Sequence, residues 1–111
     1  MERAIAAVRA KNSYFVFVIL REDFLRPAGI SMHRLALDLH VPVTRITEIA
    51  HERRGITPDT ALRLGRYFNT SARFWLNAQA AYDLEVAQDE LKSTIERDVH
   101  PATITAHSPL P

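Results

Sequence analysis

The stretch LHVPVTRITEI, residues 39–49, decides between one interrupted helix and two helices joined by a turn. A proline inside a continuous helix costs about 3 kcal/mol, whereas at the first turn of a new helix its missing N–H costs almost nothing. Pro42 therefore predicts a break near His40 and a new helix that begins at Pro42 or Val43. Histidine is among the non-glycine residues that enter the left-handed backbone region more easily, so we expect His40 at the turn.

Apolar residues recur at helical spacing on both sides of this break. Ser31 is an N-cap residue for a helix that runs to Leu39, and the helix after the break is expected to end near His51. Ala36 supplies the small residue that two crossing helices require. The apolar residues placed to lock the angle between the two helices are Leu35, Leu39, Val41, Ile46 and Ile49. These features predict a helix-turn-helix, a geometry that is also common in proteins that do not bind DNA.

Three more helices are expected, and no pair of strands is indicated. One covers residues 18–26 and ends at Pro27 and Gly29. Another is capped by Thr57 and stops at Asn69, a residue that tolerates the left-handed conformation.

The last and longest helix is expected from its N-cap Ser71 to Asp98. It has more apolar surface than a core of four other helices can cover, so we expect part of it to pack on a partner chain. Beyond it, the segment VHPATITAHSPLP contains three prolines and no helical pattern. We therefore predict an all-α fold that divides into an N-terminal tail (1–14), a helix-turn-helix domain with a C-terminal dimerisation helix (15–98) and a flexible tail (99–111).

The composition is that of an ordinary folded domain. At 111 residues, with 47% hydrophobic and 24% charged residues, the chain has room for one domain. It has no cysteine, so disulfides and thiolate metal ligands are excluded and a reducing cytoplasm is the expected compartment. The longest apolar run, residues 14–20, is about a third of the roughly 20 residues of a membrane-spanning helix, so no membrane association is expected.

The formal net charge of +1 conceals an uneven distribution. Residues 31–73 carry seven Lys and Arg against four Asp and Glu, whereas residues 83–98 carry two against six. The basic middle and the acidic end are compatible with a nucleic-acid surface placed away from an acidic helix.

Three stretches carry a family resemblance: LREDFLRPAGIS at 20–31, RITEIAHERRGITPDTALRLGRYFNTS at 45–71 and FWLNAQAAYDL at 74–84. Together they resemble the HigA (VapI-like) antitoxin family of XRE, or phage-repressor-like, helix-turn-helix proteins. The run FVFV at 15–18 departs from the family, which usually has His-Pro-Gly-Glu there. We expect Phe15 and Phe17 to extend the first helix or to cover the core.

The resemblance implies a five-helix phage-repressor-like domain and a function. Such antitoxins neutralise a HigB/RelE-like ribonuclease toxin and repress their own operon by binding operator DNA as a dimer. No cofactor and no small-molecule substrate is expected. Trp75 and Tyr82 are candidates for the dimer interface or for the core, with the core preferred for Trp75, and Leu84 is a further interface candidate.

In a helix-turn-helix the second helix of the motif lies in the major groove. The resemblance implies that the residues placed to read bases are Val43, Thr44, Thr47 and Glu48, with Arg45 near bases or phosphates. Backbone N–H groups of Ser31 and Met32 are placed to bind phosphate, and Arg53 and Arg54 to neutralise it. The alternative for these residues is an ordinary solvated helix face or plain surface charge.

Three other functions are alternatives to an antitoxin. An enzyme is not expected, because His51-Glu52-Arg53-Arg54-Gly55 lacks the second histidine of a zinc-binding HExxH motif and no nucleophile–base arrangement is visible. A module that only binds the toxin and an orphan transcriptional regulator without a toxin are the remaining alternatives.

Overall fold

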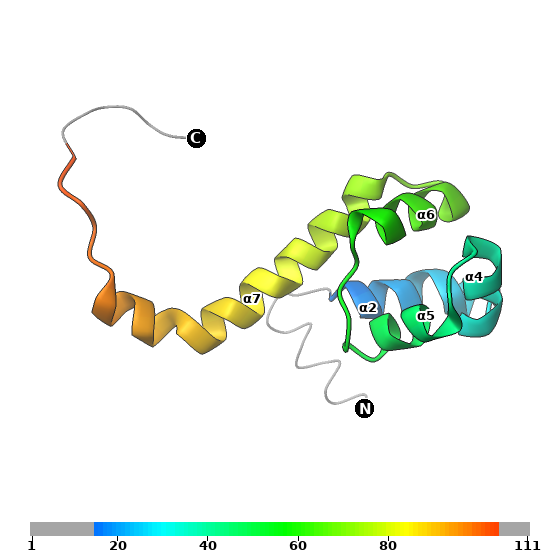
Figure 1. Ribbon diagram of the computed structural model, residues 1–111, viewed down its shortest axis with the longest axis horizontal. Helices are drawn as coiled ribbons and strands as arrows, with labels where there is room; N and C mark the ends of the chain where they lie inside the picture. Colours follow the sequence, from blue (N-terminus) through cyan, green and yellow to red (C-terminus); the bar gives the residue numbers. More distant parts are fainter. Residues whose placement is uncertain (1–14, 105–111) are drawn as a thin grey trace.

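A computed structural model describes residues 15–104, and every regular element in that range is helical (Figure 1). Three short segments, α2 (Val16–Val18), η1 (Ile19–Leu25) and α3 (Arg26–Ala28), join end to end, and α4 (Met32–Leu39), α5 (Val43–Ala50), α6 (Pro58–Phe68) and α7 (Ala72–Asp98) follow. The predicted five-helix architecture is thereby confirmed. The predicted N-terminal tail, 1–14, and residues 105–111 lie outside the described residues, and residues 99–104 are exposed and without regular structure.

The first helical rod begins earlier than the predicted residue 18. Val16, Phe17 and Val18 are all buried, so the apolar run extends the helix and covers the core, as expected. The middle of the rod is a π-helix, in which the Arg26 N–H donates to the carbonyl of Arg21, five residues earlier. Apolar spacing alone did not predict these wider turns, which lie directly before Pro27, where a regular α-helix would clash with the proline ring.

The break at the centre of the helix-turn-helix is where the sequence predicts it. Ser31 caps α4 by accepting a hydrogen bond from the Arg34 N–H at 3.0 Å. His40 ends α4 in the left-handed conformation, with φ 61° and ψ 47°. Helix α5 begins at Val43, one of the two predicted starts. Pro42 has an extended backbone and is the N-cap of this helix.

Side-chain caps also fix the start of the last two helices. The Thr57 hydroxyl accepts from the Thr60 N–H at 3.4 Å at the start of α6, and the Ser71 hydroxyl accepts from the Phe74 N–H at 3.0 Å at the start of α7. Between these helices Asn69 adopts φ 59°. All three predicted boundary residues are confirmed.

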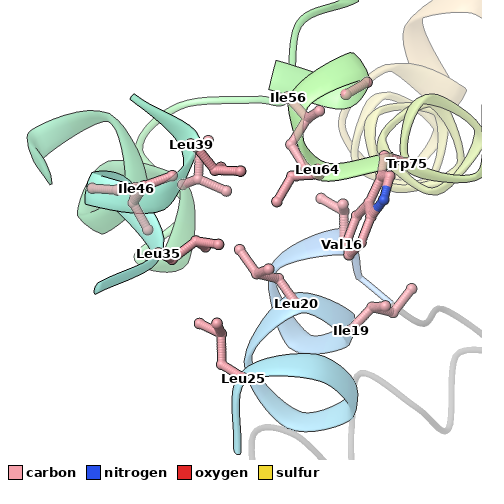
Figure 2. Packing of buried hydrophobic residues seen from close by; sticks show 13 residues of the cluster. Val16, Ile19, Leu20, Leu25, Leu35, Leu39, Ile46, Ile56, Leu64 and Trp75 are labelled. Carbon is pink, nitrogen blue, oxygen red and sulfur yellow. The ribbon is translucent and has the colours of Figure 1, made fainter. Parts of the chain in front are cut away.

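One core unites the helices (Figure 2). Leu20, Leu35, Ile46, Leu64 and Trp75 are each fully buried and come from five different helical segments. Only the beginning of α7 takes part in this core. The rest of α7 leads away from the body of the molecule, and residues 88–98 are exposed throughout (Figure 1). None of the helices described is long and apolar enough to cross a membrane.

Candidate nucleic-acid interface

Helix α5 buries one face and exposes the other. Ile46 and Ile49 are buried against the core, and Ala50 is 3% exposed. Val43 is 39% exposed, and Thr44 is exposed beside it at the beginning of the helix. Because helical residues three and four apart share a face, the buried stripe leaves the opposite face of α5 open to solvent.

The two threonines of α5 lie one turn apart. The Thr47 hydroxyl donates to the carbonyl of Thr44 at 3.2 Å, so its oxygen lone pairs remain for a donor outside the helix. Thr44 is exposed, whereas Thr47 is half-buried. A hydroxyl and a methyl group on each side chain suit both base-edge hydrogen bonds and contact with a thymine methyl.

Arg45 reaches from α5 to the start of α6. Its Nη1 donates to Asp59 Oδ2 at 2.7 Å, and the Arg63 Nε donates to the same carboxylate at 3.1 and 3.2 Å. Hydrogen bonds from Arg45 and then Arg63 lower the pKa of the Asp59 carboxyl below its ordinary value. Arg45 is therefore oriented by the protein and is not a freely mobile cation.

Glu48 also has an arginine partner, since its Oε1 accepts from the Arg54 Nε at 2.9 Å. The sequence predicts that Glu48 reads a base and that Arg54 neutralises a phosphate. The structure brings the two side chains together at the end of α5, where both are about half exposed.

The other predicted contacts lie at the two ends of the motif. Ser31 is exposed, and its hydroxyl oxygen accepts the capping bond, so its O–H proton and the backbone N–H groups of the first turn remain available to an anion. The side chain of Met32 packs against the core. Arg53 is exposed in the loop that leaves α5, directly after Glu52, which has φ 63°.

Comparison with known proteins bears on this arrangement. The chain is 57% identical over 75 residues to virulence-associated protein I of Dichelobacter nodosus, a match that covers 68% of this chain and 69% of that protein. The chain belongs to the HigA (VapI-like) family of XRE helix-turn-helix proteins. No general family model matches it.

Two solved antitoxin structures extend the likeness to 80% or more of the chain. The Pseudomonas aeruginosa antitoxin HigA, solved with the higBA promoter, superposes with a TM-score of 0.78 at 42% identity and covers 80% of this chain and 97% of its own. The antitoxin GraA, solved with its operator, has a TM-score of 0.78 at 35% identity and covers 83% and 93%.

Within this HigA-family fold, sequence reasoning missed the acidic partners of the arginines. The sequence predicts neither the bond between Arg45 and Asp59 nor a role for Arg63, although a negative charge at Asp59 suits the positive end of α6. Arg63 also donates from Nη1 to the carbonyl of Leu39 at 2.8 Å, which ties α6 to the end of α4. The contact between Arg45 and Asp59 joins residues 14 apart in different helices, so no local spacing rule predicts it.

The three dimer candidates of this HigA-family chain occupy different environments. Trp75 is fully buried and its Nε1 donates to the Thr70 hydroxyl at 2.8 Å, which is the core position preferred for it. Tyr82 is half-buried, because its ring packs edge-on against Phe15 at 4.5 Å between centroids and its hydroxyl donates to Glu52 at 3.1 Å. Burial of the ring raises the pKa of Tyr82. Leu84 is 60% exposed. Of the three candidates, it has the most side-chain surface free to contact another chain.

No group of three or more acidic or histidine side chains in residues 15–104 is arranged to hold a metal ion.

Proposed function

We propose that this chain is the antitoxin of a type II toxin–antitoxin pair, which binds operator DNA as a dimer, represses its own operon and neutralises a HigB/RelE-like ribonuclease toxin. The observation that supports it most directly is the match to the HigA antitoxin solved with a promoter, since 42% identity over 97% of that protein includes the helix-turn-helix. The exposed face of α5 supplies the chemistry that such binding requires.

In this mechanism α5 enters the major groove with its first residues against base edges. Thr44 and Thr47 present hydroxyl and methyl groups to the bases, and Val43 supplies an apolar contact. Arg45 is held by its bond to Asp59 at the start of α6 and supplies a guanidinium group beside these residues in the sequence. The backbone N–H groups of Ser31 and Met32 and the side chains of Arg53 and Arg54 fix the register by binding phosphates.

A single domain with so few phosphate contacts binds DNA weakly, so two domains are required. Leu84, Leu91 and Ile95 are between 47% and 60% exposed on α7, and their spacing places them along one side of the helix. Exposed apolar side chains in such a line are covered when a second copy packs on them. Two copies related by a two-fold axis then present two α5 helices to two half-sites.

A gel-shift titration tests the DNA half of this function. The full chain should retard a duplex that spans the region upstream of its own gene, at concentrations that leave an unrelated duplex of equal length free. Retardation should weaken steeply as salt is raised, because phosphate contacts release counterions. Failure to retard the upstream duplex even at low salt would sink the DNA-binding proposal.

Co-expression tests the toxin half. Family membership supports this half, and the partner is expected to be encoded by a neighbouring open reading frame. Expression of that frame alone should arrest growth, and expression together with this chain should restore it. A harmless neighbour, combined with a positive gel shift, would instead favour an orphan regulator.

A further inference from the structure

We propose that Asp59 is a positioning residue for sequence discrimination, which holds Arg45 in the orientation that reads a base edge and penalises its use as a general phosphate ligand. The inference rests on the proposed DNA-binding function and deepens it. Asp59 thereby has a role although it is an acidic residue on a surface that has to attract the negatively charged DNA.

The carboxylate of Asp59 is itself firmly placed. Asp59 is the second residue of α6, after Pro58, where the positive end of the helix dipole favours a negative charge. Arg63, one turn along α6, donates to both of its oxygens, and Arg63 is in turn tied to the Leu39 carbonyl. The acceptor that Arg45 meets is therefore held by α6 and by the end of α4, independently of Arg45.

The geometry leaves part of the guanidinium free for DNA. Arg45 uses Nη1 for its 2.7 Å bond to Asp59, and its side chain is 29% exposed. Nε and Nη2 carry donors in the fixed fork that matches the O6 and N7 acceptors of guanine. The Arg45 guanidinium can thus bind two partners at once. Its Nη1 keeps the bond to Asp59 while Nε and Nη2, on another edge of the same planar group, bind a base.

The penalty arises when the DNA is not the operator. An exposed ion pair of this kind contributes too little to prevent Arg45 from binding a phosphate. However, a carboxylate at the groove repels the phosphates that such binding brings near, and only a correctly placed base edge compensates for that repulsion. Removal of the negative charge should therefore help non-operator DNA more than operator DNA.

The test is a fluorescence-anisotropy titration of the full chain and the Asp59→Asn variant on operator duplex and on a scrambled duplex of the same composition. Asp59→Asn should bind the scrambled duplex at least about threefold more tightly, with a salt slope steeper by about one phosphate contact. Its ratio of scrambled to operator Kd should fall, because the scrambled duplex gains more affinity than the operator, by a factor of up to about tenfold, the scale of one good base contact.

Glu22→Gln is the matched control, because Glu22 also accepts from an arginine, Arg26, at 2.8 Å, but lies outside α5 and α6. It should change both affinities by the same factor. A second control is Asp59→Asn in the Arg45→Gln background, where the discrimination should not fall further if Asp59 acts through Arg45.

The positioning role is overturned if the unaltered chain prefers its operator and Asp59→Asn leaves that preference unchanged, or if the loss persists without Arg45. If the unaltered chain has no preference for any upstream sequence, the proposed function fails and the positioning role fails with it. The two failures are therefore distinguished by the unaltered chain alone.

Discussion

At the residue scale, backbone conformation at His40 sets the angle between α4 and α5. Its φ of 61° lies in the left-handed region of the backbone. This conformation costs a residue with a Cβ atom about 1 kcal/mol or more, and glycine avoids this cost. The pattern around Pro42 was sufficient to place the turn at this residue. The same conformation at Glu52 was not predicted, because no proline or glycine marks the end of α5 in a comparable way.

His40→Gly should raise the free energy of unfolding by up to about 1 kcal/mol, and His40→Val should lower it, since a β-branched residue is strained there. Urea unfolding followed by circular dichroism measures both. His33→Gly is the matched control, because His33 is exposed in the first turn of α4, where glycine should instead destabilise by about 0.5 kcal/mol or less. Equal effects of glycine at the two histidines would contradict this account of the turn.

The readout threonines give a second prediction at this scale. Changing Thr44 and Thr47 together to alanine should weaken operator binding about tenfold or more, because base-edge hydrogen bonds and methyl contacts are lost. The helical content should stay the same, since alanine favours helix and neither side chain belongs to the core. Anisotropy titration on the operator checks the first statement and circular dichroism the second. Unchanged operator affinity in the double variant would refute α5 as the readout helix.

At the scale of the element, helix boundaries were predictable wherever a side chain satisfies the backbone. Ser31, Thr57 and Ser71 each accept the N–H bond that an N-cap should accept, and these bonds involve residues three apart. The π-helical turns of η1 were not predictable, because they depend on how the rod meets Pro27 and on packing by distant helices. The exposure of the α5 face that carries Thr44 and Thr47 was predictable from helical periodicity alone. The ion pairs of Arg45 and Glu48 were not.

Ala36 is the residue at which the crossing of α4 and α5 can be tested. It is 2% exposed and belongs to the buried core, so a larger side chain would have to displace its neighbours. Ala36→Leu should lower the free energy of unfolding by about 1 to 3 kcal/mol through overpacking. Thermal unfolding should show the loss, and the matched change Ala80→Leu, at an exposed position of α7, should leave the midpoint nearly unchanged. A midpoint that shifts equally in both variants would contradict a tight crossing at Ala36.

At the scale of the whole molecule, charge and shape separate two surfaces. The basic middle of the chain contains α5 and its arginines, and the acidic stretch, residues 83–98, lies on the part of α7 that leaves the body (Figure 1). An acidic helix close to DNA would oppose binding, so its distance from α5 favours a role in contacts between proteins. The apolar side chains on the same stretch support this role. They also offer a reason for the length of α7, because an isolated helical extension is marginal in water and is stabilised when its apolar side packs on another chain.

The dimer proposal makes a prediction that no single domain could satisfy. Leu91→Ser together with Ile95→Ser removes two half-exposed apolar side chains from α7 without touching the core. Sedimentation equilibrium should show the unaltered chain as a dimer and this variant as a monomer. Leu62→Ser, which changes a leucine that is 65% exposed on α6, should remain a dimer.

The same variant should lose operator affinity by about 100-fold or more, because the second half-site no longer gains from an effective concentration set by the first. Its affinity for a duplex with one half-site should be unchanged, since α5 is untouched. If the variant is a monomer yet binds the full operator as tightly as the unaltered chain, α7 contributes to assembly but the operator is read without it. If the variant remains a dimer, the line of apolar residues on α7 is not the interface.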